Sequence, residues 1–139
     1  AGNNLTLSTT SDNLQTLVNS KAVSVSDLVL IPVEPSPVSI RKTITFDPII
    51  MEAIKGRGKA FSFLMDFYKN ESLSMQCLAF LESGQLEIPF SGITIRHATI
   101  VTQAEGMMKS VCQYAPRTNV ASDFKKLAKA VLAHLNTEC

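Results

Sequence analysis

The sequence contains no tryptophan, only two histidines and only three cysteines among its 139 residues. The cysteines are Cys77, Cys112 and Cys139, an odd number without close spacing, which argues against a disulfide framework and favours a reducing compartment such as the cytoplasm. No apolar run approaches the roughly 18 residues that a membrane-spanning helix needs, so we expect no membrane span. The net charge of +1 gives the whole chain little attraction to nucleic acid or anionic lipid.

Side chains in catalytic or metal-binding patterns are also scarce. His97 and His134 belong to no recognisable nucleophile or metal motif. A zinc site of His97, Cys77 and Cys112 is conceivable, but their spacing does not suggest one, so buried thiols and a surface histidine are favoured. Carboxylates occur singly, without an acid–base pair. We therefore predict a protein that is not an enzyme and that holds no metal or cofactor.

The basic segment 55–59 reads Lys-Gly-Arg-Gly-Lys, which superficially suggests a phosphate cradle. It lacks the Gly-x-x-x-x-Gly-Lys-Ser/Thr spacing of a phosphate-binding loop, and a predicted helix precedes it where that motif requires a strand. The segment is better interpreted as an exposed basic turn that can touch phosphates non-specifically.

What the sequence does contain is enough apolar material for one globular domain, with 45% hydrophobic and 18% charged residues. Five of its nine aromatic residues lie between positions 59 and 80, which predicts the centre of the core there. We expect two helices in this stretch, one at about 59–69 and another from Ser72 to Glu82, with Gly84 as its C-terminal signal.

Two stretches have the alternation of β-strands. Residues 38–46 place Val38, Ile40, Ile44 and Phe46 on one side, which predicts a half-buried strand. Asp47-Pro48 then signals a helix start. Residues 85–101 alternate around a Ser-Gly turn at 91–92 and predict a β-hairpin, whose first strand is confined to a sheet edge by a proline at position 89.

The two ends of the chain differ in character. Residues 1–11 are a polar arm, a short helix follows, and residues 28–31 favour either a strand or one helical turn. Prolines at 32, 35 and 37 predict an extended connector. Near the C-terminus, a capping box at Thr102 and Glu105 begins one helix, and residues 122–136 form the most clearly amphipathic helix of the chain.

Together these patterns predict a single-domain α+β protein in which about five helices pack with a small, mostly antiparallel sheet made of strand 38–46 and hairpin 85–101. Residues 1–37 would form the arm, short helix and proline-rich connector, and residues 38–139 would form the core domain.

The leading functional hypothesis is a non-enzymatic interaction or self-assembly module, a homo-oligomer or the binder of a protein partner. An edge strand can recruit another chain, and the residues expected to do so are Leu86, Ile88 and Phe90. The chain opens Ala-Gly-Asn-Asn instead of with methionine, which suits a processed viral structural or accessory protein.

The alternative hypothesis is a nucleic-acid-binding protein with a basic face. The residues expected on that face are Arg41, Lys42, Arg57, Lys59, Lys125, Lys126 and Lys129. Residues 42–48, Lys-Thr-Ile-Thr-Phe-Asp-Pro, followed by a helix, a glycine-containing turn and a second helix, resemble the ribbon-helix-helix family of DNA-binding proteins. That resemblance implies a dimer whose paired strands read the major groove through Arg41, Thr43 and Thr45.

Overall fold

The structure is a computed structural model, and it describes residues 5–6, 25–54 and 59–136. Its centre is a four-stranded sheet in the order β1-β2-β3-β4, in which every neighbouring pair is parallel. The strands are β1 (Leu5–Thr6), β2 (Leu28–Val33), β3 (Lys59–Phe67) and β4 (Phe90–Arg96). The described helices are α2 (Pro37–Ala53), α3 (Ser72–Glu82), α4 (Thr99–Gly106), α5 (Val111–Tyr114) and α6 (Asn119–Asn136).

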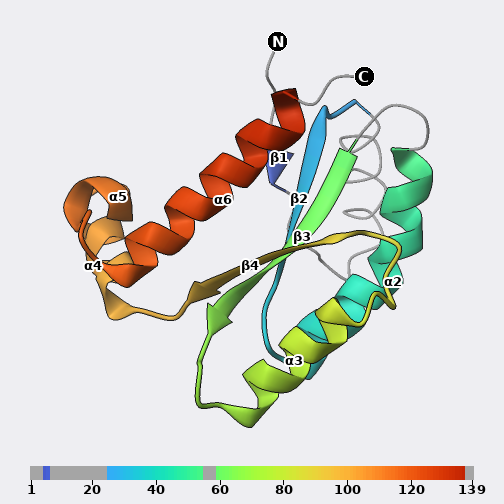
Figure 1. Ribbon diagram of the computed structural model, residues 1–139, viewed down its shortest axis with the longest axis horizontal. Helices are drawn as coiled ribbons and strands as arrows, with labels where there is room; N and C mark the ends of the chain where they lie inside the picture. Colours follow the sequence, from blue (N-terminus) through green and yellow to red (C-terminus); the bar gives the residue numbers. More distant parts are fainter. Residues whose placement is uncertain (1–4, 7–24, 55–58, 137–139) are drawn as a thin grey trace.

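The domain has three layers, with the sheet between two layers of helices (Figure 1). Helices α2 and α3 connect β2 to β3 and β3 to β4, and both crossovers step in the same direction across the sheet, so both helices lie on one face. Helix α6, with α4 and α5, covers the other face. Parallel strands that alternate with helices make this a Rossmann-like α/β domain. The predicted α+β class with a mostly antiparallel sheet is therefore wrong.

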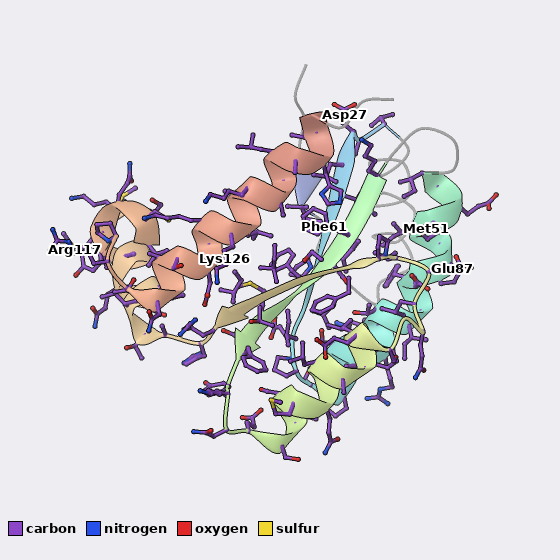
Figure 2. The ribbon with its side chains drawn as sticks, in the orientation of Figure 1. Asp27, Met51, Phe61, Glu87, Arg117 and Lys126 are labelled. Carbon is purple, nitrogen blue, oxygen red and sulfur yellow. The ribbon has the colours of Figure 1, made fainter. Side chains whose placement is uncertain are left out.

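Strand β3 is the stretch around which the core forms, as the aromatic content predicted, but it is not a helix. Phe61, which is labelled in Figure 2, and Phe63 pack against the α6 side. Ala60 and Leu64 pack against α2 and α3. A strand covered by helices on both faces is apolar at almost every position instead of alternating. The predicted helix at 59–69 was wrong because such a run has no strand periodicity to distinguish it from a buried helix.

Residues 38–46, predicted as a strand, lie inside α2. The Ser36 hydroxyl caps this helix by accepting a hydrogen bond from the Ser39 N–H at 3.1 Å, and Pro37 is its first residue. The buried side chains of α2 recur at helical spacing; they are Thr43, Phe46, Asp47 and Ile50. The chain remains helical through Pro48, so Asp47-Pro48 does not start a helix. The alternating pattern fitted a strand, but the cap and the packing against β2 favour the helix.

The predicted hairpin at 85–101 was also wrong. Only β4 is a strand there, and it runs parallel to β3. Pro89 precedes the strand and contributes its carbonyl, which accepts from the Ser62 N–H at 2.9 Å. Gly92, with φ +81°, lies at the register shift between the pairs Ser62–Phe90 and Leu64–Thr94, so it occupies a β-bulge instead of a hairpin turn.

The remaining predictions concern individual helices and strands. Helix α3 spans the predicted residues 72–82, and Gly84 takes the left-handed conformation just beyond it, with φ +75°. Residues 28–31 are part of strand β2, which lies between β1 and β3. They were predicted to precede the core domain of residues 38–139, but they belong to its sheet. The expected helix after Thr102 is divided into α4 and α5, and the C-terminal helix begins at Asn119. The short helix expected after residue 11 lies outside the described residues.

Candidate functional site

The carboxyl ends of β3 and β4 lie side by side and open onto a pocket of about 730 Å³. In open parallel sheets, ligands bind beyond the carboxyl ends of the strands, because the loops that leave the strands diverge there. Two short segments line the pocket, one after β3 and one at the end of β4. The lining residues are Phe67, Tyr68, Lys69, Asn70, Glu71, Thr94, Arg96 and His97. We call this the carboxyl-edge pocket.

An aromatic pair forms one wall of the carboxyl-edge pocket. The rings of Tyr68 and His97 stack with their centroids 4.7 Å apart and their planes 20° apart. The His97 backbone N–H donates to the Phe67 carbonyl at 3.0 Å, and its ring Nδ1 lies 3.4 Å from an Asp66 carboxylate oxygen. Asp66 has a φ of +53°, an uncommon conformation for a residue other than glycine. The pair is thus tied to the ends of both strands.

The loop after β3 is fixed by Ser74 at the start of α3. The Ser74 hydroxyl, which is fully buried, accepts from the Tyr68 N–H at 3.2 Å and donates to a Glu71 carboxylate oxygen at 3.2 Å. These hydrogen bonds hold the Tyr68 backbone against the start of α3, which positions the aromatic wall of the pocket.

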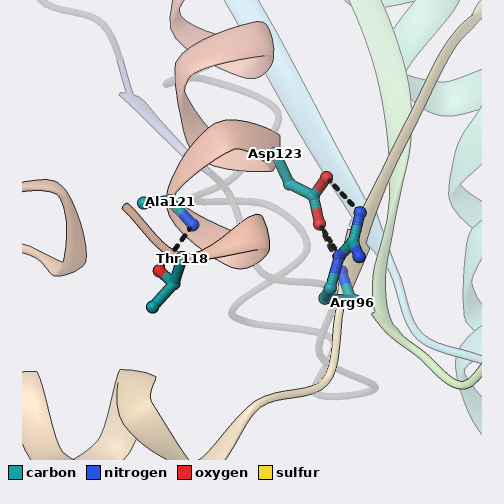
Figure 3. Close-up of polar contacts among 4 residues, drawn as sticks. All are labelled: Arg96, Thr118, Ala121 and Asp123. Atoms are coloured by element: carbon teal, nitrogen blue, oxygen red, sulfur yellow. Dashed lines mark hydrogen bonds and ion pairs between the residues drawn. The ribbon is translucent and has the colours of Figure 1, made fainter. Parts of the chain in front are cut away.

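A clamp between β4 and α6 positions the cationic side of the pocket (Figure 3). Arg96 donates to Asp123 through Nε at 2.7 Å, through Nη2 at 3.1 Å and through its backbone N–H at 3.1 Å. Helix α6 presents Asp123 because its first turn is held by Thr118, whose hydroxyl accepts from the Ala121 N–H at 3.3 Å. The arginine side chain is half exposed and the aspartate side chain is buried.

Arg96 and Asp123 change each other's ionisation. Burial by itself would raise the pKa of Asp123, but the hydrogen bonds from the Arg96 side chain and backbone, with the charges of Arg96 and Lys126, hold that pKa below its usual range. The hydrogen bond to Asp123 in turn raises the pKa of Arg96 above its ordinary value. Both groups are therefore charged at neutral pH, and the guanidinium is held in one orientation.

The sequence did not single out these pocket residues. The sequence does contain a signal for the pocket. The apolar run of residues 60–65 leads into the polar residues Lys69, Asn70 and Glu71. A strand followed by polar residues marks the carboxyl edge of a parallel sheet. This signal was missed because the run was interpreted as a helix. A zinc site of His97 with Cys77 and Cys112 is not suggested by their spacing in the sequence. Among the described residues, no group of three potential ligands could hold a metal ion.

The basic residues predicted from the sequence do not form one surface. Arg41 and Lys42 lie on α2, whereas Lys125, Lys126 and Lys129 lie on α6, on the opposite face of the sheet. Lys59 is half-buried in β3, and its ammonium donates to the His134 carbonyl at 2.9 Å. Arg57 lies outside the described residues.

The ribbon-helix-helix resemblance is wrong, because the segment that would be its strand is a helix. Its base-reading residues Arg41, Thr43 and Thr45 lie in α2 instead of in a strand. Thr43 is buried, and the hydroxyls of both threonines donate to the carbonyls four residues earlier in the helix.

Of the residues predicted for self-association, Ile88 is buried and Leu86 and Phe90 are partly buried. Ile88 is 3% exposed, and Leu86 and Phe90 pack against the same core as α2 and α3. Residues 86–89 are not a strand, so the expected edge does not form there. Self-association itself stays a prediction, which sedimentation over a range of concentrations would test.

Comparison with known proteins assigns no family to this chain. No protein-family model matches it, and no curated protein matches it significantly. Within residues 5–6, 25–54 and 59–136, no helix is both long enough and apolar enough to cross a membrane.

Proposed function

We propose that this α/β domain binds a small molecule carrying a flat ring and an anionic group in the carboxyl-edge pocket. The observation that supports the proposal is the pocket itself, about 730 Å³ at the ends of two adjacent parallel strands. This volume lies within the range of small-molecule sites, roughly 300–1,000 Å³. The position is the one at which open parallel sheets bind ligands.

The side chains of the pocket suggest the chemistry of the ligand. Tyr68 is 44% exposed and its ring stacks on that of His97, so it offers an oriented surface for another flat ring. Lys69 and Arg96 supply positive charge. The bonds from Arg96 to Asp123 use Nε and Nη2 and leave Nη1 outside the ion pair, so a ligand anion could bind there. The proposal concerns binding and assigns no reaction.

Replacing Tyr68 with alanine is expected to weaken binding of a ring-bearing anion about two- to tenfold, because one stacked aromatic pair contributes about 0.5–1.5 kcal/mol. Isothermal titration with nucleoside phosphates and aromatic carboxylates would measure the change. The matched control is Tyr114→Ala, which removes the other tyrosine, exposed on α5 and away from the pocket. If no compound of either class binds the intact chain, or if both variants bind equally well, the proposal is wrong.

A second candidate function is binding of nucleic acid along α6. Lys125, Lys126 and Lys129 are all exposed on this helix, and its one acidic residue, Asp123, is buried against Arg96. The exposed face of α6 therefore carries positive charge without a neighbouring carboxylate of its own. Such a face attracts phosphates and releases counterions when it binds them.

Changing Lys125 and Lys126 to glutamate should reduce binding of a duplex oligonucleotide at least tenfold at low salt, because each phosphate contact contributes to affinity. Fluorescence anisotropy at several salt concentrations would report both affinity and salt dependence. The double variant Arg41→Glu/Lys42→Glu alters the opposite side of the sheet and should bind like the unmodified chain. Equal losses in both double variants would show a general charge effect and would argue against a site on α6.

A further inference from the structure

The turn between α4 and α5 exposes two large apolar side chains in succession. Met107 is 56% exposed and Met108 is 94% exposed. Tyr114, at the end of α5, is also exposed. Among these residues Lys109 and Arg117 are exposed cations, and Arg117 projects from this end of the molecule in Figure 2. We call the group Met107, Met108, Lys109, Tyr114 and Arg117 the α4–α5 corner.

Met108 occupies a backbone position that favours glycine. Helix α4 ends in a Schellman motif, in which the Lys109 N–H donates to the Ala104 carbonyl at 3.0 Å. Met108 is the left-handed residue of that motif, with φ +55°. A side chain at this conformation is strained, and here it packs against almost nothing that could compensate. Glycine would therefore fit this backbone position better, and the methionine side chain contributes little to the stability of the fold.

The charges around the corner are predominantly positive. Lys125 is exposed and donates to the Pro116 carbonyl at 3.5 Å, which holds it beside the loop that carries Arg117. Between residues 99 and 129 the exposed acid is Glu105, because Asp123 is buried against Arg96. The exposed cations of this stretch are Lys109, Arg117, Lys125, Lys126 and Lys129. An apolar tip with Lys109 next to it in the chain, and with Arg117 and Lys125 on the loop and helix that follow, is complementary to a surface that is negatively charged outside and apolar beneath.

We propose that the α4–α5 corner docks on an anionic lipid bilayer. The methionines would enter the boundary between headgroups and acyl chains, Tyr114 would lie at the headgroup level, and the cations would face the lipid phosphates. A lipid surface suits this corner better than a protein partner does, because a stable protein interface needs about 800 Å² from each side and the apolar tip is two side chains. Contact of this kind is peripheral and reversible.

The test is flotation of the full chain with vesicles of phosphatidylcholine alone and with vesicles that also contain phosphatidylglycerol. We expect binding to the anionic vesicles that weakens with added salt. Met108→Gly should lower that binding about tenfold or more when combined with Met107→Ser. Met108→Gly should leave the melting temperature unchanged or raise it, because glycine relieves the left-handed strain. Lost binding without lost stability would distinguish docking from a structural role.

Two control variants make the result specific. Met75→Ser removes another exposed methionine, 47% accessible on α3, and should bind vesicles as the unmodified chain does. Lys109→Glu/Arg117→Glu should abolish binding, whereas Arg41→Glu on α2 should not. The proposal is overturned if the intact chain fails to float with anionic vesicles. It is equally overturned if binding persists in the methionine variants, since attraction by charge alone would then explain it.

Discussion

Replacing Asp47 with alanine is expected to lower the free energy of unfolding by about 2–4 kcal/mol, among the largest effects of any single polar substitution in this domain. Asp47 is 6% exposed within α2. One of its carboxylate oxygens accepts from the Glu87 N–H at 2.8 Å, and the other accepts from the Ile88 N–H at 2.9 Å. Alanine would remove the acceptor of both donors, of which the Ile88 N–H is buried and the Glu87 N–H is partly buried. A buried unsatisfied group costs about 1–3 kcal/mol, and a partly buried one costs less because water can reach it.

The consequence extends beyond the two hydrogen bonds. The carboxylate fixes the segment that leads from α3 into β4, and Ile88 in that segment is part of the core. Loss of the anchor should therefore loosen the entry of β4 into the sheet. Figure 2 shows Glu87 beside α2 at this junction. The local pattern at Asp47-Pro48 predicts a helix cap, whereas in the fold Asp47 joins a helix to a distant loop.

Urea unfolding followed by circular dichroism would measure the effect. Glu52→Ala is the matched control, because Glu52 is an exposed carboxylate on the same helix and its loss should change stability by no more than about 0.5 kcal/mol. Asp47→Asn should fall between them, since an amide keeps one acceptor but turns a donor toward the second N–H. Similar stabilities for the Asp47→Ala and Glu52→Ala variants would contradict this interpretation.

Replacing Arg96 with alanine is expected to destabilise the domain by about 2–4 kcal/mol, because it leaves the buried Asp123 carboxylate without its charged partner. The Asp123 side chain is 5% exposed, while that of Arg96 is 48% exposed. The reverse change, Asp123→Ala, should therefore cost less, since water can solvate the freed guanidinium. Thermal unfolding of both variants, with Arg117→Ala as an exposed-arginine control, would show this asymmetry. Equal losses in the two variants would contradict it.

The same pair should give stability a defined pH dependence. The pKa of Asp123 is lowered in the folded chain, so its contribution is fully present above the unfolded pKa of about 3.9 and is lost as the pH falls through the folded pKa. Unfolding measured from neutral to acidic pH should show this loss in the unmodified chain. In Asp123→Asn the loss should be smaller, because that side chain does not titrate. Parallel profiles for the two proteins would show that other carboxylates dominate.

Local signals in the sequence were sufficient where one element could form without regard to its neighbours. Helix α3 was predicted with its bounds because Gly84 marks its end, and the amphipathic pattern of residues 122–136 located most of α6. The same pattern placed Lys125, Lys126 and Lys129 on the exposed side, where the structure has them. Each of these signals lies within the element that it describes.

Residues 38–46 and 59–67 show where local signals fail. Either segment could be strand or helix by its own pattern, and each took the opposite state from the one predicted. Strand β3 needs β2 and β4 as partners and helices on both faces before an unbroken apolar run becomes favourable as a strand. Once β3 is a strand, its neighbours must connect by crossovers, and the segment from Pro37 must form the first of them.

The sequence by itself determined that this chain forms a core around its aromatic residues 59–80, that α3 and most of α6 are helices, and that α6 carries lysines on its outer side. Only the tertiary structure decided that the sheet is parallel, and therefore that Tyr68, Arg96 and His97 meet at one edge. The physical reason is that strand pairing joins residues distant along the chain. Its direction depends on hydrogen bonds and helix packing that no single segment contains.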